Sequence, residues 1–238
     1  MENELRLAPS GDLALVASFG NEISEALNTK VRALMLALEK VNVEGIVEMT
    51  PTYCSLMIHY DPLRIGYETL CGRVRETLEA LDDIELPAPR VIEIPVLYGG
   101  EYGPDLDYVA QHNGLSVDEV IEIHTSRNYR IYMLGFTPGF PYLGGMDERI
   151  ATPRLETPRT KIAGGSVGIA GAQTGIYPID SPGGWQIIGR TPVALYDPQS
   201  AEPILLKAGE SIRFVQIDQK TFDRISRDMQ RGSKEGRA

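Results

Sequence analysis

The segment that decides the fold of the second part of the chain is residues 164–190, "GGSVGIAGAQTGIYPIDSPGGWQIIGR". Glycine and proline interrupt it too often for a helix, and short β-prone stretches such as "GWQIIGR" lie between them. The wider segment 135–192 holds 12 of the 24 glycines and 7 of the 16 prolines of the chain. This pattern predicts a closed or nearly closed β-barrel with elaborate loops, and it does not suit a doubly wound parallel sheet.

A second unusual segment, residues 135–145, reads "GFTPGFPYLGG". Its glycines and prolines exclude a regular helix or a central strand, so Phe136, Phe140 and Tyr142 are expected on a loop of fixed shape. Such a loop is either a plug of the core or one wall of a binding site.

The first part of the chain has the periodicity of a strand, a helix, two strands and a second helix. The stretch "LALVASF" is β-prone, and "GIVEMTPTYCSLMIHYDP" gives two further β-rich runs separated at residues 51–52. Apolar residues three and four positions apart predict the two helices, the first after an Asn21 cap. These residues are Ile23, Leu27, Val31, Leu34, Leu38 and Val41 in the first helix, and Tyr67, Leu70, Val74, Leu78 and Leu81 in the second. The order is close to half of a split βαβ sandwich.

The stretch "LPAPR" at residues 86–90 is predicted to be a linker between two domains, because a new apolar strand, "VIEIPVLYGG", follows it. We therefore expect an α+β protein with domains at residues 1–88 and 89–238. A short helix is expected after Pro104, and Ser116 and Glu119 have the spacing of a capping box for a further helix that carries His124 near its end. The residues after Val215 predict a final helix.

Composition excludes several classes of function. The net charge of −10 argues against nucleic acid or an anionic membrane as a general partner. Cys54 and Cys71 lack metal-ligand spacing, so neither a metal site nor a disulfide framework is expected. The acidic N-terminus does not resemble an export signal, and a cytoplasmic location is expected. The uncharged run 162–179 contains five glycines and is interpreted as buried loop and strand.

The local charge is reversed between residues 149 and 190. This segment contains five cations and only two acids, Glu156 and Asp180, a balance of 5 − 2 = +3. Prolines beside Arg154 and Arg159 restrain the backbone, which would preorganise two planar donors for a carboxylate or a phosphate. The alternative is ordinary ion pairing on the surface of an acidic protein. The five cations are Arg149, Arg154, Arg159, Lys161 and Arg190.

Three further residues each have a functional and a structural interpretation. Ser166 occupies the nucleophile position of "GGSVG", but all histidines precede it, so a serine in a turn or a ligand-binding serine is the stronger interpretation. His124 is suited to a general base or to a packing and capping role. Trp185 is suited to covering a site or to core packing. The chain has no G-x-x-x-x-G-K-[ST] loop, so it does not resemble an ATPase by itself.

The run "GFTPGFPYLGG…TPRLETPRTKIAGGSVGIAGAQTGIYPIDSPGGWQIIGRTP", together with "IPVLYGGEYGPDL" and "IHTS", resembles a known family across nearly the whole chain. This is the family of the B subunits of bacterial ATP-dependent 5-oxoprolinase, also called the kinase-A-inhibitor or allophanate-hydrolase-subunit-1-like family. The resemblance implies a ferredoxin-like domain followed by a cyclophilin-like β-barrel. It also implies action with subunits A and C, in which ATP is the co-substrate and 5-oxoproline is opened to glutamate.

The same resemblance leaves a second function open, a module that binds and inhibits a sensor histidine kinase; proline isomerase activity ranks third. In the enzymatic interpretation, "GFTPGFPYLGG" lines a pocket. The residues expected in the chemistry are His124, Arg154, Arg159 and Ser166. Those expected to bind the ligand are Phe136, Pro138, Gly139, Phe140, Tyr142, Gln173, Tyr177, Trp185 and Arg190.

Overall fold

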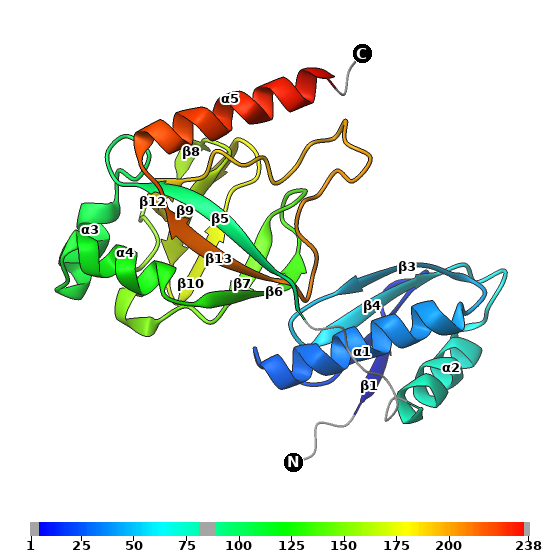
Figure 1. Ribbon diagram of the computed structural model, residues 1–238. Helices are drawn as coiled ribbons and strands as arrows, with labels where there is room; N and C mark the ends of the chain where they lie inside the picture. Colours follow the sequence, from blue (N-terminus) through cyan, green and yellow to red (C-terminus); the bar gives the residue numbers. More distant parts are fainter. Residues whose placement is uncertain (1–4, 81–88, 236–238) are drawn as a thin grey trace. The chain divides into compact units, whose positions relative to one another are not determined.

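The computed structural model describes residues 5–80 and 89–235 (Figure 1). Contacts within the chain divide it into two compact units, residues 1–88 and 89–238, and each unit is described by itself. Most of the predicted linker, residues 86–88 of 86–90, lies outside the described residues, as does Leu81 of the second predicted helix. No helix within the described ranges is long and apolar enough to cross a membrane.

The first unit is a four-stranded antiparallel sheet in the order β1-β2-β4-β3, with two helices packed on it. Two β-hairpins and two helices follow one another as β1, β2, α1, β3, β4 and α2. The bounds are β1 (Arg6–Pro9), β2 (Ala14–Ser18), α1 (Glu25–Val41), β3 (Ile46–Pro51), β4 (Ser55–Tyr60) and α2 (Tyr67–Glu79). The two predicted β-runs on either side of residues 51–52 are confirmed.

Helix α1 forms because its apolar residues lie on one face, and that face is buried against the sheet. Leu27, Val31, Leu34 and Leu38 are all buried in the same cluster as the inward residues of β2 and β4. The predicted Asn21 cap is wrong: Ser24 is the N-cap, so the helix starts later than expected. The predicted apolar stripe is also too long, because Ile23 and Val41 at its two ends are exposed.

Strand β1 was not predicted. It is four residues long, pairs with β2 and occupies one edge of the sheet. In a βαββαβ sandwich the corresponding edge strand follows the second helix, whereas here a strand before the first helix supplies it. The described residues therefore support an α+β sandwich for this unit.

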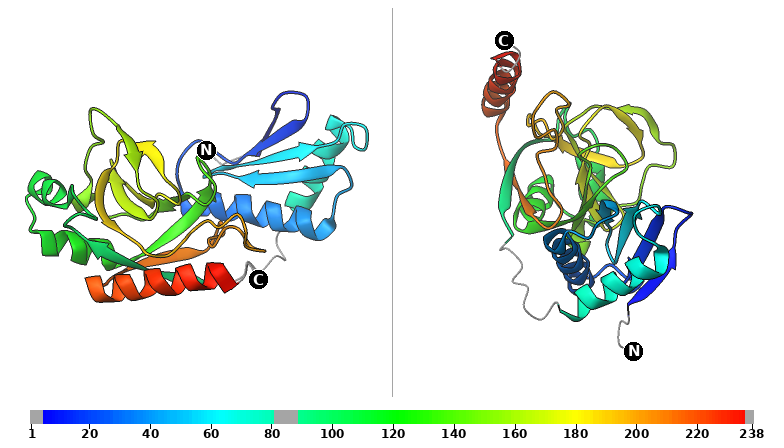
Figure 2. Two further views of the ribbon diagram at one scale, coloured as in Figure 1. Left: turned by 90° about the horizontal axis from the view of Figure 1, so that it is seen from above. Right: turned by 90° about the vertical axis from the view of Figure 1, so that its right-hand side faces the viewer.

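The second unit contains a seven-stranded sheet in the order β10-β9-β12-β5-β13-β6-β7 (Figures 1 and 2). Its two end strands, β10 and β7, contact each other, so the sheet is nearly closed into a barrel. All neighbouring strands are antiparallel except β5 and β13. A separate antiparallel pair, β8 and β11, lies beside the site described below. The barrel-like sheet predicted from the glycine and proline pattern is confirmed.

The strands of this unit are β5 (Val91–Tyr98), β6 (Asn128–Leu134), β7 (Pro141–Gly144), β8 (Arg159–Ile162), β9 (Ser166–Ala170), β10 (Gln173–Ile176), β11 (Ser181–Gly183), β12 (Gln186–Arg190) and β13 (Ser211–Gln216). The helices are α3 (Leu106–Asn113), α4 (Val117–Thr125), the 3-10 turn η2 (Glu148–Ile150) and α5 (Gln219–Glu235). The capping box of Ser116 and Glu119 is confirmed at the start of α4.

The core of the second unit lies inside the barrel-like sheet and beneath α3 and α4. Ile94, Val96, Ile131, Ile169 and Phe214 come from four different strands and are all buried there. Helix α5 lies outside the sheet against β5 (Figures 1 and 2). Residues 193–197, "VALYD", are β-prone in sequence but form a loop with an isolated bridge at Tyr196.

Candidate functional site

The second unit contains an aromatic cavity of about 430 Å³, which is within the usual size range of small-molecule sites. It is bordered by the loop before β7, the segment 153–158, the start of β10 and the strand β11 with the turn after it. Seven of the expected site residues line it: Phe136, Phe140, Tyr142, Arg154, Gln173, Tyr177 and Trp185. Pro158, Pro182, Gly183 and Gly184 also line it and were not predicted, although they belong to the same turns rich in glycine and proline.

Phe140 is the centre of the aromatic wall. Its ring meets four others edge to face, at centroid distances of 5.6 Å to Phe136, 5.3 Å to Tyr142, 5.7 Å to Tyr177 and 5.8 Å to Trp185. Each such pair contributes about 0.5–1.5 kcal/mol beyond the burial of its surface. The segment 135–145 is therefore both a packing element and a wall of a cavity.

Gly175 allows the indole of Trp185 to lie directly on β10. A Cβ atom at position 175 would lie 3.0 Å from the Trp185 ring and 3.4 Å from Cζ of Phe140. A side chain there would require the Trp185 ring to shift, whereas the distance of the Cβ atom to Phe140 is that of an ordinary contact. The glycine is thus required by the close approach of the ring to the backbone.

Phe136 differs from the other aromatic residues of the cavity wall because its side chain is not packed in the core. Its φ angle is +61°, in the left-handed region that a phenylalanine rarely adopts, and its side chain is 65% exposed. The turn is fixed by the N–H of Gly135, which donates to the carbonyl of Phe140 at 3.1 Å, and by the N–H of Phe140, which donates to that of Thr137 at 3.0 Å. Such a conformation costs about 1–3 kcal/mol and is concentrated at functional sites.

Arg154 is carried by a segment whose backbone is tied to the sheet on both sides. Thr152 and Gly171 exchange backbone hydrogen bonds of 3.2 and 2.7 Å. The N–H of Leu155 donates to the carbonyl of Gly184 at 2.7 Å, and the side-chain amide of Gln186 donates to the carbonyl of Pro153 at 2.9 Å. The Arg154 backbone is therefore held in place while its side chain borders the cavity.

The five cations of the segment 149–190 are not equivalent. Four of them have a partner at hydrogen-bond distance. Arg149 and Lys161 are exposed and fit the surface-pairing interpretation, Arg159 pairs with a largely buried carboxylate, and Arg190 donates to a backbone carbonyl. Arg154 makes no hydrogen bond or ion pair with any residue in the described part of the chain. The four pairs are Arg149–Asp147 at 2.8 Å, Arg159–Asp105 at 2.7 Å, Lys161–Asp180 at 2.8 Å and Arg190 Nε to the Gly164 carbonyl at 2.9 Å.

Arg159 does not line the aromatic cavity. Its guanidinium donates to Asp105, the residue before α3, and to the Trp185 carbonyl at 3.3 Å. The other oxygen of Asp105 accepts from the N–H of Ile187 at 2.6 Å. Arg159 thus connects β8, the start of α3 and β12, and the expected two-arginine clamp is not assembled on the aromatic cavity.

Ser166 and Arg190 line a second, smaller cavity of about 160 Å³ together with Arg159. No histidine is among the described residues that line it, so Ser166 has no general base there. Ser166 is buried as the first residue of β9. Pro138 and Gly139 lie in the turn that leads to Phe140 and do not line either cavity.

His124 is buried in the core and is not a wall residue of the aromatic cavity. The hydroxyl of Thr174 donates to the Gly168 carbonyl at 3.0 Å, so it accepts from Nε2–H of His124 at 2.8 Å. Nδ1 then accepts from the hydroxyl of Tyr98 at 2.7 Å. Burial lowers the pKa of His124 to about 3. The expected chemical role of His124 is therefore replaced by a neutral, structural one.

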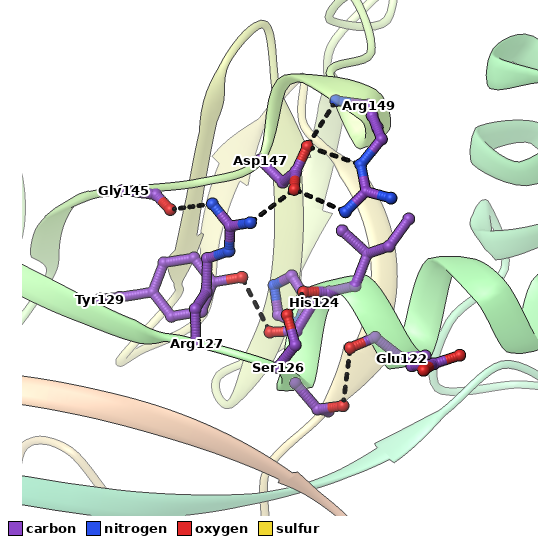
Figure 3. A network of polar contacts seen from close by, with 10 residues as sticks. Glu122, His124, Ser126, Arg127, Tyr129, Gly145, Asp147 and Arg149 are labelled. Atoms are coloured by element: carbon purple, nitrogen blue, oxygen red, sulfur yellow. Dashed lines mark hydrogen bonds and ion pairs between the residues drawn. The ribbon is translucent and has the colours of Figure 1, made fainter.

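A polar network near the end of α4 was not predicted from the sequence. Asp147 lies between Arg127 and Arg149 and accepts from both, and the Tyr129 hydroxyl donates to the His124 carbonyl at 2.8 Å (Figure 3). Hydrogen bonds from Arg149 hold the pKa of the Asp147 carboxyl well below its ordinary value. The network joins α4, β6 and η2 and does not border the aromatic cavity. The feature of the sequence that could have indicated this network is Asp147, which caps the 3-10 turn η2.

The fold and the cavity define an α+β protein with a barrel-like sheet that carries an aromatic cavity bordered by one arginine. The family described as "Carboxyltransferase domain, subdomain C and D" matches residues 5–206. The 5-oxoprolinase B subunit of Bacillus subtilis (strain 168) is 48% identical over 223 residues, which cover 89% of this chain and 92% of that protein. That of Escherichia coli O157:H7 is 43% identical over 86% of this chain and 93% of its own length. The chain belongs to the family of 5-oxoprolinase B subunits within these carboxyltransferase domains, and the predicted resemblance is confirmed.

Two solved structures are similar to this chain in sequence and fold. A crystal structure of PH0987 from Pyrococcus horikoshii is 52% identical, with a TM-score of 0.55, over 91% of this chain and all of that one. A crystal structure of TTHA0988 is 40% identical, with a TM-score of 0.77, over 86% of this chain. The match spans 40% of the TTHA0988 chain.

Proposed function

We propose that this chain is the B subunit of an ATP-dependent 5-oxoprolinase, which opens 5-oxo-L-proline to L-glutamate together with subunits A and C. The observation that carries the proposal is the identity of 48% with a 5-oxoprolinase B subunit over 92% of its length. At that identity the two chains have the same fold and align along nearly all of it.

The chemistry explains why the chain would act with partners. Hydrolysis of an unstrained cyclic amide is coupled to ATP hydrolysis in the proposed reaction. The sequence has no G-x-x-x-x-G-K-[ST] loop to hold the phosphates of ATP. We therefore infer that this chain is inactive alone and that the complex with subunits A and C is the active unit.

We also propose that the two units correspond to a ferredoxin-like domain and a cyclophilin-like barrel. For the first unit, the support is the arrangement of β2, α1, β3, β4 and α2, to which β1 adds the edge strand. For the second unit, it is the contact between the end strands β10 and β7.

Reconstitution from separately purified subunits tests the proposed function. We expect 5-oxoproline-dependent release of phosphate and formation of glutamate only when this chain and subunits A and C are all present. Turnover by this chain alone, or equal turnover by subunits A and C without it, would contradict the proposal. Omitting 5-oxoproline from the full set controls for unrelated ATP hydrolysis.

A further inference from the structure

The aromatic cavity combines a cation that pairs with no residue of the described chain and walls that carry no acid. Arg154 is the one charged residue among the described residues that line it, and no aspartate or glutamate is among them. A ligand carboxylate that enters the cavity would therefore meet one positive charge and no negative charge. In a chain with a net charge of −10, such a site selects for an anionic group.

We propose that Arg154 binds the carboxylate of a small cyclic amide whose ring packs against the wall formed by Phe136 and Trp185; this inference rests on the proposed function and gives the substrate a place in this chain. The guanidinium presents a planar fork that matches a carboxylate with two parallel hydrogen bonds. The backbone ties on both sides of Arg154 fix the point from which its side chain reaches the cavity.

The remaining polar groups of the cavity suit an amide and not a second charge. Gln173 brings a side-chain amide, which has both a donor and an acceptor, as a cyclic amide does. Tyr177 is buried, and this burial raises the pKa of its hydroxyl to about 12, so the phenol stays neutral at physiological pH. A single cation beside neutral polar groups fits the closed lactam, which carries one carboxylate, better than glutamate, which carries a second carboxylate and an ammonium group with no acid in the wall to pair with.

Phe136 and Trp185 provide the apolar part of the site from two different loops. Trp185 is 8% exposed and supplies a fixed surface, whereas Phe136 is 65% exposed at the border of the cavity. Burying the exposed Phe136 ring against a bound ligand would recover apolar surface that is now in water. The left-handed backbone of Phe136 keeps the ring at this border.

The test uses Trp185, the only tryptophan of the chain, as a reporter. This chain is labelled with 5-fluorotryptophan and assembled with unlabelled subunits A and C, so that the fluorine signal comes from Trp185 alone even in the complex. 5-Oxoproline, 2-pyrrolidinone and glutamate are titrated in turn. We expect a saturable shift of the signal with 5-oxoproline, and at least about tenfold weaker binding of glutamate and of 2-pyrrolidinone, which lacks the carboxylate.

Arg154→Ala should weaken 5-oxoproline binding at least about tenfold and leave 2-pyrrolidinone binding unchanged, because only the former has a carboxylate. Arg154→Lys should restore little of the loss because lysine lacks the planar fork. Arg149→Ala is the matched control, since that arginine is paired with Asp147 and lies outside the cavity.

Three results would overturn the inference: no change of the signal in a complex that turns over 5-oxoproline, unchanged 5-oxoproline binding in Arg154→Ala, or an equal loss of 2-pyrrolidinone binding. Failure of the proposed function is separate, since it would appear as a complex without turnover. In that case, the same titration of the labelled chain alone decides whether the cavity takes a cyclic carboxylate.

Discussion

Asp105 and Arg159 form an ion pair of 2.7 Å that joins the start of α3 to the first residue of β8. Asp105 is the more buried partner, with a side-chain exposure of 12% against 33% for Arg159. The same carboxylate also accepts the N–H of Ile187, so three segments that are distant in sequence meet at one acidic group. This relationship makes Arg159 part of the framework behind the aromatic cavity.

Arg159→Ala should therefore destabilise the second unit, because it removes the cation from a largely buried carboxylate. We expect the free energy of unfolding to fall by about 1–3 kcal/mol. Urea unfolding followed by Trp185 emission measures it for the second unit. Lys161→Ala is the control, since Lys161 and Asp180 are both exposed and their pair should contribute less than about 1 kcal/mol. Equal losses in the two variants would contradict the structural role of Arg159.

Gly175→Ala should disturb the aromatic wall, because the new methyl group would lie only 3.0 Å from the ring of Trp185. Overpacking of this kind costs about 1–3 kcal/mol. We expect a lower free energy of unfolding, measured by circular dichroism, together with a shift in Trp185 emission. Gly72→Ala is the control: a Cβ atom at that helical position meets nothing within 4 Å, so this variant should be as stable as the parent or more so. An unchanged emission spectrum in Gly175→Ala would count against the described packing.

His124 should make the stability of the fold sensitive to acid. Its pKa is about 3 in the folded chain because of burial, whereas an unfolded histidine has a pKa near its ordinary value of 6.5. The unfolded state therefore binds a proton more readily, and the stability contributed by neutral His124 is complete above pH 6.5 and is lost as the pH falls from there towards 3. The slope from this one group is about 1.4 kcal/mol per pH unit within that window.

The measurement is the free energy of unfolding as a function of pH, for the parent and for His124→Gln. We expect the variant to be less stable at neutral pH and to lose the part of the slope that His124 contributes. His112→Gln is the control, because His112 is exposed and stacks on Tyr108 at the surface. Identical slopes in the parent and in His124→Gln would show that His124 is not a buried neutral group.

Substitutions of Phe136 should affect the stability of the chain and the activity of the assembled enzyme differently. Both Phe136→Gly and Phe136→Ala lose the edge-to-face pair with Phe140, but only the glycine relieves the left-handed backbone, so Phe136→Gly should be more stable than Phe136→Ala by about 1 kcal/mol. Both variants remove the exposed ring, and on the proposed function we expect both to lower kcat/KM of the assembled enzyme at least about tenfold. Retention of full kcat/KM by both variants would place the Phe136 ring outside the substrate site.

The parts of the fold that could be predicted from sequence are those in which burial repeats with a local period. The apolar residues of α1 recur at helical spacing, and the break at residues 51–52 separates β3 from β4. The glycines and prolines of residues 164–190 predict the barrel-like sheet because they exclude a long helix and mark turns between short strands. The ends of elements could not be predicted in the same way: Asn21 was expected to cap α1, whereas the N-cap is Ser24, whose side chain makes no capping hydrogen bond.

Local patterns in the chain were enough to specify the two helical stripes, the capping box at α4 and the turn that carries Phe136 and Phe140. The prediction that Tyr142 also lies on a loop was wrong, because Pro141–Gly144 form strand β7 and pair with β6. Which of these residues share a cavity depends on packing between remote segments. The partner that neutralises Arg159 is 54 positions away, at Asp105, and the two that bond the His124 ring are 26 and 50 positions away, at Tyr98 and Thr174. Arg154 and Arg159 look alike in sequence because prolines flank both, yet only Arg159 has an ion-pair partner among the described residues. Charge neutralisation and burial depend on distances between strands that are remote in the chain, and no local pattern encodes those distances.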